Sequence, residues 1–403
     1  MYFLPDEIII TIGLLLPIKD NSILSQTNSR FNNIICNSET FWKRKFSFDY
    51  GESRQKGSWK LAYYNYGQIT VFGYPLFYPN GINPPNFYND YKSITQIPKI
   101  RAKKVYCDSS SIMIIDINEN IKSLGSGGMH GAKYVFIPNS LFNSPAKDIS
   151  EENNYRVMID INNDVWLSGH IKLGKRTNQY SPIKTTIKIP DIKARSISSG
   201  FRHTLILDIN NNVWSFGDNF YGQLGLNDKN DRYEPTQIPG IQAKYITCGT
   251  ETTFIIDIND NILGFGRNFG NLGLGDVQER LTPVRIPDIK GKSVSCSIDH
   301  TIIIDMDNNI WGTGDNSAGQ LGLGDKEHRR FFTQIPNIKT KAVSSCDYHT
   351  MLIDMDDNVW GFGSNSNSQL GLGDRIHRLI PTQVPYIKAR SVSCSKLHSV
   401  VLL

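Results

Sequence analysis

The stretch DMDDNVWGFGSNSNSQLGLGD, Asp354 to Asp374, places one tryptophan among glycines, asparagines and aspartates. A closely related stretch, DMDNNIWGTGDNSAGQLGLGD, begins at Asp305. The leading aspartates of the whole series are Asp116, Asp160, Asp208, Asp257, Asp305 and Asp354. Their spacings are 44, 48, 49, 48 and 49 residues, and self-similarity at such a period predicts a propeller or a solenoid.

A single unit, Lys292 to Asp325 and the segment that follows it, contains short β-branched runs separated by turn residues. The runs SVSC, TIIID and NIWGTG predict three strands. Asn308 and Asn309 suit the positive-φ positions of a tight hairpin turn between the second and third strands. The glycines of GQLGLGD predict a compact turn, and Phe332 to Ile338 predicts a closing strand that tolerates a proline. Each repeat is therefore predicted to form one blade of antiparallel strands.

A column of prolines gives the number of blades. Its members are Pro98, Pro138, Pro190, Pro239, Pro287, Pro336 and Pro385. The first unit lacks its first half, and the last unit stops where its second half is due. Pairing of the strand near Ile69 with the last dozen residues would close the ring and remove exposed sheet edges. The predicted fold is mainly β: a seven-bladed β-propeller over residues 66–403, preceded by a small all-α domain.

Composition argues against several classes of function. The net charge is +5, with acids and bases interspersed, so there is no basic patch of the kind that nucleic-acid binding requires. The apolar run from Ile8 to Ile18 is too short to span a bilayer and contains Pro17. We expect an intracellular protein, cytoplasmic or nuclear, that contacts neither nucleic acid nor membrane.

Cysteines and histidines recur at repeat positions, which predicts structural roles. The cysteines in comparable places are Cys107, Cys248, Cys296, Cys346 and Cys394, and the histidines are His203, His300, His349 and His398. We expect buried thiols, since no CxxC pair occurs, and histidines that hydrogen-bond the local backbone, since each belongs to a separate blade. No catalytic residue, metal site or cofactor is predicted, and the protein is expected not to be an enzyme.

The repeat resembles a known family. The pattern WxFGxNxxGQLGLGD, followed by a proline and a histidine, resembles the regulator of chromosome condensation repeat, and this resemblance implies a seven-bladed propeller. It is strongest from Ile197 to Leu403 and weaker in the first three units, which lack GQLG.

The first 66 residues show no such period but a helix-like alternation, which predicts a helical domain at 1–48 and a helical linker at 49–65. Phe3 to Phe46 resembles an F-box, with Asn21 and Thr27 departing from its apolar pattern. The resemblance implies a surface for a Skp-type adaptor. Its residues are Leu4, Pro5, Ile8, Ile12, Leu16, Pro17, Leu24, Phe31 and Trp42.

Together the two resemblances imply a non-enzymatic substrate-recognition subunit of a cullin-type ubiquitin ligase. The F-box would bind a Skp adaptor and through it a cullin, the propeller would bind a target protein, and the chain would be monomeric outside the complex. The combination is similar to giant-virus F-box/repeat proteins, which implies a host adaptor. One alternative is a guanine-nucleotide exchange factor for a Ran-type small GTPase, and another is a protein-binding scaffold with a degenerate F-box.

The irregular early units carry a dense group of aromatic residues. Those predicted to bind the target are Tyr74, Phe77, Tyr78, Phe87, Tyr88 and Tyr91. Aromatic residues are enriched in interface cores, but these rings would equally fill the space left by the absent GQLG connector. Both interpretations stay open from the sequence.

Overall fold

The computed structural model describes residues 41–42, 45, 68–73, 95–97, 100–107, 111–125, 137–138, 145–152, 155–169 and 183–403. The chain divides into two compact units, Met1–Gln68 and Ile69–Leu403. In the first unit Phe41 and Trp42 are helical and buried, with their rings edge to face and the centroids 5.3 Å apart. None of the described helical residues belongs to a helix long and apolar enough to cross a bilayer.

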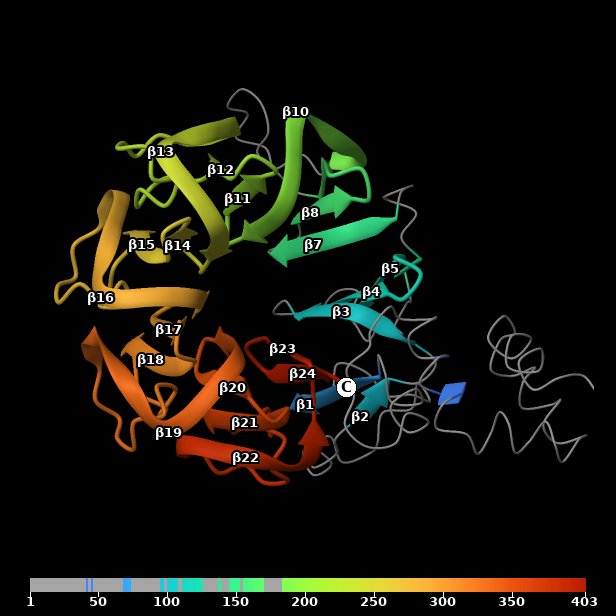
Figure 1. Cartoon of the computed structure of the whole chain (residues 1–403), viewed down its shortest axis with the longest axis vertical. Coiled ribbons are helices and arrows are strands. Elements are labelled where there is room, and N and C mark those ends of the chain that lie inside the picture. The colour runs from blue at the N-terminus through green and yellow to red at the C-terminus, as the bar shows by residue number, and fades with distance from the viewer. Residues whose placement is uncertain are drawn as a thin grey trace, which may run out of the picture. The chain divides into compact units, whose positions relative to one another are not determined.

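The second unit is a ring of antiparallel strands (Figure 1). Its regular part has four long strands: β10 (Ile183–Ser199), β13 (Arg232–Cys248), β16 (Arg280–Cys296) and β19 (Arg329–Cys346). Each long strand pairs first with the hairpin before it and then with the hairpin after it, so it is the outer strand of one blade and the inner strand of the next. The hairpins are β11 (His203–Asp208) with β12 (Asn212–Gly217), β14 (Thr252–Asp257) with β15 (Asn261–Gly266), β17 (His300–Asp305) with β18 (Asn309–Gly314), and β20 (His349–Asp354) with β21 (Asn358–Gly363).

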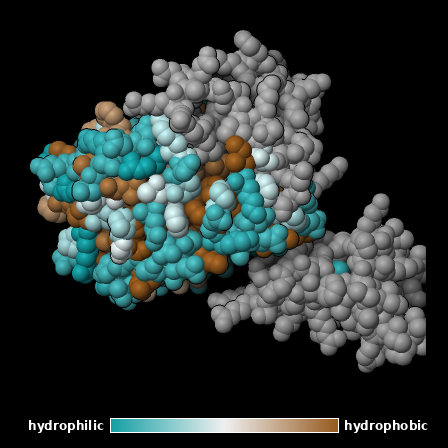
Figure 2. Space-filling model, turned by 90° about the horizontal axis from the view of Figure 1, so that it is seen from above, coloured by the Kyte–Doolittle hydropathy of each residue, from teal (hydrophilic) through white to brown (hydrophobic). Residues whose placement is uncertain are grey.

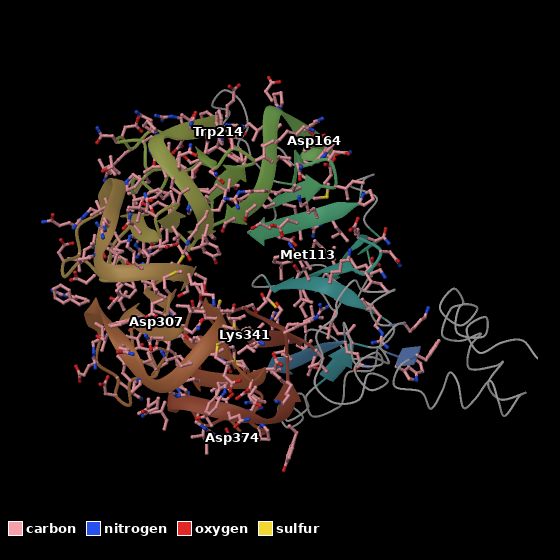
Figure 3. All side chains as sticks on the ribbon, viewed as in Figure 1. Met113, Asp164, Trp214, Asp307, Lys341 and Asp374 are labelled. Carbon is pink, nitrogen blue, oxygen red and sulfur yellow. The ribbon has the colours of Figure 1, made fainter. Side chains whose placement is uncertain are left out.

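The earlier blades use shorter strands. These are β3 (Ala102–Cys107), β4 (Ser111–Asp116), β5 (Ile121–Gly125), β6 (Ile137–Pro138), β7 (Ala146–Glu152), β8 (Tyr155–Asp160) and β9 (Asp164–Gly169). Met113, labelled in Figure 3, belongs to a core that also contains Ile149 and Met158. Apolar side chains from β4, β7 and β8 thus pack together between successive blades.

Both ends of the propeller chain meet in one blade. The strands involved are β1 (Ile69–Gly73), β2 (Thr95–Ile97), β23 (Ser391–Cys394) and β24 (His398–Leu402), in the order β2-β1-β24-β23. The register places Ile69 opposite Leu402 and Gly73 opposite His398, so the predicted closure is confirmed. Phe72 of β1 packs closely against Gly371, since a Cβ added at Gly371 would lie 2.8 Å from the phenylalanine ring.

The described strands make seven four-stranded blades. We call the closing blade blade 1, β3–β6 blade 2, and continue in chain order to blade 7, whose outer strand is β22 (Arg378–Lys388). Because the strands are antiparallel, successive connections alternate between the two faces of the ring. We name the face with the GQLG-type connectors the connector face, and the face with the Asp-led hairpin turns the turn face.

The repeated aspartate stabilises its hairpin turn. Asp354 Oδ1 accepts the amides of Asp356 and Asn358 at 2.8 and 2.9 Å, and Oδ2 accepts Nδ2 of Asn358 and Nε1 of Trp360, each at 2.8 Å. Burial raises the pKa of Asp354, but these hydrogen bonds together lower it by more, so the net pKa lies below its ordinary value. The Trp214–Asp208 pair, with Trp214 labelled in Figure 3, repeats the contact at 3.0 Å.

The turn differs from the prediction in one respect. Asn308 has a φ of 64°, as expected, but Asn309 does not have a positive φ. The side-chain amide of Asn309 instead donates to Asp305 Oδ2 at 2.8 Å. A side-chain bond to the leading aspartate therefore explains this second asparagine.

The inner strands are linked around the ring by serine hydroxyls. Ser198 Oγ accepts the amide of Cys248 at 2.9 Å, and Ser393 Oγ accepts the amide of Cys107 at 2.9 Å, which joins blade 1 to blade 2. The sequence suggested that Cys346 occupies a place comparable to that of the other cysteines. It does not, because Ser345 donates the equivalent amide to Ser295. The position whose amide bonds to the preceding blade is therefore a cysteine in blades 1, 2 and 5 and Ser345 in blade 7.

Candidate protein-interaction site

The connectors of blades 4 to 7 share one hydrogen-bonded backbone. In blade 4, Asn219 Oδ1 accepts the amide of Leu224 at 2.9 Å, and Asn219 Nδ2 donates to the carbonyl of Asp228 at 2.9 Å. In blade 6, Asn316 makes the same pair of bonds, to Leu321 at 2.9 Å and to Asp325 at 3.0 Å. The bonds recur for Asn268 and Asn365.

Two further features complete this shared framework. The leucine whose amide bonds to each asparagine has a fully buried side chain: Leu224, Leu272, Leu321 and Leu370. At the loop tip an amide donates to a side-chain oxygen two residues later, from Tyr221 to Gln223 at 2.9 Å and from Ala318 to Gln320 at 2.9 Å. The framework therefore uses the backbone of the tip residue and leaves its side chain free to vary.

The tip side chains differ sharply between blades. Blades 4 and 5 carry Phe220, Tyr221 and Phe269, and the exposed fractions of Phe220 and Phe269 are 68% and 56%. Blades 6 and 7 carry small or polar residues in these places: Ser317, Ala318, Ser366 and Asn367. Large exposed rings that the framework does not need suggest a contact with another molecule.

An arginine joins the two aromatic connectors. The Arg267 guanidinium carbon lies 3.7 Å from the ring centroid of Phe269 and 5.7 Å from that of Tyr221. Its Nη1 forms an ion pair with Glu251 Oε2 at 2.8 Å. Phe220 packs edge to face on Tyr221, with centroids 4.8 Å apart. These contacts hold the rings in one arrangement before a partner arrives, which lowers the entropy lost on binding.

We define the aromatic sector as residues 200–202, 218–232, 249–251, 266–280 and 297–299 of the connector face. Its five cationic side chains each have an ion-pair partner. The pairs are Arg202–Asp218 at 3.7 Å, Lys229–Glu279 at 2.5 Å, Arg232–Asp228 at 2.6 Å, Arg267–Glu251 at 2.8 Å and Arg280–Asp276 at 2.6 Å. Such partly exposed pairs contribute little to stability, but they neutralise all of the sector's positive charge.

Asp299 has an unusual environment in this sector. Burial raises its pKa above the ordinary value, Arg267 lowers it, and the carboxylates of Asp315, Asp347 and Glu251 raise it again. Its Oδ1 is buried and has no hydrogen-bond partner among the described residues. Several carboxylates therefore converge at this point of the connector face.

Three of the four recurring histidines, His203, His300 and His349, join neighbouring blades, whereas His398 lies against Ser395 of its own blade. Nε2 of His203 lies 3.0 Å from Thr253 Oγ1, and Nε2 of His349 lies 2.8 Å from Ser399 Oγ, each in the next blade. In these three histidines the expected bond to the local backbone is replaced by one to a hydroxyl of the next blade. Burial lowers the pKa of His203, His300, His349 and His398 to about 3, 4, 3 and 4.

The thiols are buried as well. Burial raises the pKa of Cys296 to about 12 and that of Cys394 to about 11. All five cysteines in the described ranges are free of disulfides. No group of three or more His, Cys, Asp or Glu side chains in that part of the chain could hold a metal ion.

Most residues that the sequence predicted as sites lie outside the described residues. These are Leu4, Pro5, Ile8, Ile12, Leu16, Pro17, Leu24, Phe31, Tyr74, Phe77, Tyr78, Phe87, Tyr88 and Tyr91. Trp42 is described and is 2% exposed. Phe220, Tyr221 and Phe269 were not predicted as site residues, although alignment of NFYGQLG and NFGNLG with NSAGQLG isolates them.

Comparison with known proteins gives the family of the repeats. The family description "Regulator of chromosome condensation (RCC1) repeat" matches residues 210–256 and 356–402, and a second description of the same repeat matches 194–223 and 292–320. The chain carries these repeats in an RCC1-like propeller. No curated protein matches the sequence.

Solved structures share the propeller fold. Yeast RCC1 (Prp20) in complex with Kap60 is 18% identical, with a TM-score of 0.72, over 83% of this chain and 89% of that one. Prp20p from Saccharomyces cerevisiae, described with its binding to Gsp1p and histones, is 19% identical, with a TM-score of 0.72, over 83% and 92%. Human WBSCR16 is 16% identical, with a TM-score of 0.72, over 83% and 98%. At these identities the likeness shows the fold.

Proposed function

We propose that the protein is a non-catalytic recognition protein that binds a partner protein through the aromatic sector of its RCC1-like propeller. The observation that carries this proposal is the exposure of Phe220 and Phe269 on loops whose backbone is held in the same way where small residues stand instead. Aromatic residues and arginine dominate the energetics of many protein interfaces.

A substitution set copied from blade 6 tests this proposal. Phe220→Ser, Tyr221→Ala and Phe269→Ala together give blades 4 and 5 the small tip residues that Ser317 and Ala318 provide in blade 6. We expect affinity purification with the full chain to recover a partner that the triple variant loses. The control is Tyr386→Ser, because Tyr386 is a fully exposed aromatic residue on the turn face. Equal recovery with the triple variant would contradict the proposal.

Nucleotide exchange on a Ran-type small GTPase is the first specific activity to test. It is supported by the RCC1 repeats and by the likeness in fold to Prp20p, which is described with its binding to Gsp1p. We expect the full chain to accelerate release of labelled GDP from such a GTPase, and the triple variant to do so more slowly. A GDP release rate that is unchanged at a saturating concentration of the chain would contradict this activity.

The role of a ubiquitin-ligase subunit is a second candidate, supported by the ordered resemblance of Phe3–Phe46 to an F-box. Since Trp42 is buried, it would stabilise the helical unit, and residues such as Leu4 and Pro5 would contact the Skp-type adaptor. Co-purification should then recover the adaptor and a cullin with the full chain, and Leu4→Ala with Pro5→Ala should lose both. Failure of the full chain to recover an adaptor would contradict this role.

The early aromatic group remains a second proposed target contact. Its members are Tyr74, Phe77, Tyr78, Phe87, Tyr88 and Tyr91. Replacing them by serine should weaken target capture if they bind the target. If they only fill space, the substitutions should instead lower the free energy of unfolding.

A further inference from the structure

Two side-chain bonds recur where successive blades meet. We call each such boundary a seam. In the first bond, a serine hydroxyl on the inner strand of one blade accepts an amide from the inner strand of the next blade. The pairs are Ser150–Ser199 at 2.9 Å, Ser198–Cys248 at 2.9 Å, Ser295–Ser345 at 2.9 Å and Ser344–Cys394 at 3.0 Å.

The second bond lies on the connector side of the same seams. The side chain at the histidine position, which is a tyrosine in blade 3, reaches a hydroxyl of the next blade. The pairs are Tyr155–Thr204 at 2.9 Å, His203–Thr253 at 3.0 Å, His300–Thr350 at 3.2 Å and His349–Ser399 at 2.8 Å. From blade 3 round to blade 1, four of the five seams therefore carry both bonds.

The seam between blades 5 and 6 has neither bond among the described residues. Thr247 stands in the serine position, and its Oγ1 lies 3.9 Å from Cys296 Sγ and makes no bond to the Cys296 amide. Thr252 stands in the histidine position, and its Oγ1 donates to the carbonyl of Arg267 in its own blade at 3.2 Å. Thr301 of blade 6 is fully buried, and its Oγ1 has no hydrogen-bond partner in the described part of the chain. The seam is therefore exceptional in two independent repeat positions.

The backbone contacts that remain on the connector side of this seam are long. Asn271 Nδ2 donates to the carbonyl of Ile298 at 3.3 Å, and the amide of Thr250 donates to the carbonyl of Ser297 at 3.4 Å. At the seam between blades 4 and 5, the matching amide of Phe201 donates to the carbonyl of Thr250 at 3.0 Å. Hydrogen bonds weaken as they lengthen beyond about 3.2 Å, so these contacts do not replace the two that are absent.

Other parts of the same seam are well fastened. Nearer the turn face, Tyr245 Oη donates to the carbonyl of Val294 at 3.0 Å. At the rim, Phe332 stands where the outer strands of blades 4, 5 and 7 have a proline, and a Cβ added at Gly273 would lie 2.4 Å from its ring. The weakness is thus confined to the connector side, where Arg267 lies.

The difference between the seams lies in the interior. Figure 2 shows apolar residues set among hydrophilic ones over one side of the described propeller surface, whereas Thr252 and Thr301 are at most 1% exposed. A buried hydroxyl without a partner costs free energy in the closed seam, and water would satisfy it on opening. Opening is therefore less costly here than at a seam that must break two good bonds.

We propose that the connector side of the seam between blades 5 and 6 opens before the other seams from blade 3 to blade 1. Blade 5, which carries Arg267 and Phe269, then moves against blade 6 about the contacts of Tyr245 and Phe332. Local opening in a native structure takes place where the fewest contacts must be broken. The inference goes beyond the proposed function, because it concerns the ring itself and holds whatever the aromatic sector binds.

Amide hydrogen exchange of the full chain, resolved to single residues, tests the order of opening. Ser297 donates its amide to the carbonyl of His300 at 3.0 Å, so the amide of Cys296 points away from β17 and toward blade 5. The equivalent amide of Ser345 is bonded to Ser295. After correction for intrinsic rates, Cys296 should exchange at least about fivefold faster than Ser345, as the loss of one ordinary hydrogen bond implies. Equal rates would overturn the inference.

A seam variant copies the fastening of blades 6 and 7 into this seam. Thr247→Ser with Thr252→His supplies the counterparts of Ser295 and His300. It should slow exchange at Cys296 to about the rate at Ser345 and raise the urea midpoint of unfolding. Thr247→Ser alone, a change of one methyl group, should slow exchange at Cys296 even if the double variant does not fold.

The matched reversal is Ser295→Thr with His300→Thr, which should transfer the fast exchange to the amide of Ser345. Circular dichroism and a thermal melt establish that each variant is folded. A folded seam variant in which exchange at Cys296 is unchanged would overturn the inference, as would a folded reversal in which exchange at Ser345 is unchanged. These outcomes leave partner recovery with the aromatic triple variant unaffected, so the proposed function is decided separately.

Discussion

The connectors of blades 4 and 5 and those of blades 6 and 7 have the same framework and different tips. Asn219 and Asn316 make matching bonds to the leucine amide, at 2.9 Å in both blades. Yet Phe220 stands where Ser317 does. Residues that recur in all four loops are those that the fold requires, and residues that change between loops are free to serve a partner. The repeat therefore contains its own control for separating stability from function.

The largest effect is expected at the shared framework. Leu224→Ala in blade 4 and Leu321→Ala in blade 6 each remove a fully buried side chain. Each should lower the free energy of unfolding by about 2–5 kcal/mol, through lost burial and the cavity left behind. Urea denaturation checks this. The two losses should agree within about 1 kcal/mol, and a large loss in only one blade would show that the frameworks are not equivalent.

The next effect concerns pH. His300 is buried and its pKa is lowered to about 4, so it stays neutral in the folded state while the unfolded chain takes up a proton below about 6.5. The stability that depends on the neutral imidazole is therefore complete above about pH 6.5 and falls as the pH drops from about 6.5 to about 4. The slope is up to about 1.4 kcal/mol per pH unit for each such histidine.

Blade 5 supplies the matched variant, because Thr252 occupies the histidine position there. His300→Thr should make the acid sensitivity of urea unfolding shallower by about 1.4 kcal/mol per pH unit in that window. His377→Thr is the control, since His377 is exposed. An unchanged slope in His300→Thr would show that this histidine is not held neutral.

A smaller effect is expected at the connector tip of blade 7, where a serine replaces a glycine. Ser368 has a φ of 60° and a buried Oγ without a hydrogen-bond partner among the described residues, whereas blades 4 and 6 have Gly222 and Gly319 there. Ser368→Gly removes both the left-handed strain and the orphaned hydroxyl, so it should raise the free energy of unfolding by about 1 kcal/mol, measured by urea denaturation. Gly319→Ser in blade 6 should have the opposite sign. Destabilisation by Ser368→Gly would show that the serine conformation is not strained.

The smallest effect on stability is expected at the aromatic tips. Phe220→Ser, Tyr221→Ala and Phe269→Ala should change the free energy of unfolding by less than about 1 kcal/mol in total, because the lost contacts are exposed and the backbone bonds remain. The same urea titration measures it. A loss comparable to that of Leu224→Ala would show that the rings belong to the structure and not to a binding surface.

The repeat made much of the fold predictable from the residues. The Asp column predicted the hairpins and the proline column predicted the blades. The truncated units at both ends predicted the closure between β1 and β24. What could not be predicted depends on neighbours across blades. The bond from His203 to Thr253 joins positions 50 residues apart. The spacing of Cys346 from Asp354 already differs from that of the other cysteines by one residue, but the bond from the amide of Ser345 to Ser295 could not be read from it.

The candidate site was less predictable, for a physical reason. Resemblance draws attention to residues that recur, while partner contacts occur where the repeat departs from its pattern. Phe220 and Phe269 lie inside the most regular blades, where the recurring residues around them dominate the pattern. Trp42, predicted to contact an adaptor, is buried, and its ring packs edge to face on that of Phe41.

Amide hydrogen exchange of the full chain, free and bound to the partner recovered by affinity purification, tests the central claim most directly. Protection is predicted at the tips of blades 4 and 5, residues 219–223 and 268–271, and not at the matching tips of blades 6 and 7, residues 316–320 and 365–369. Equal protection at all four tips, or protection confined to blades 6 and 7 or to the turn face, would contradict it.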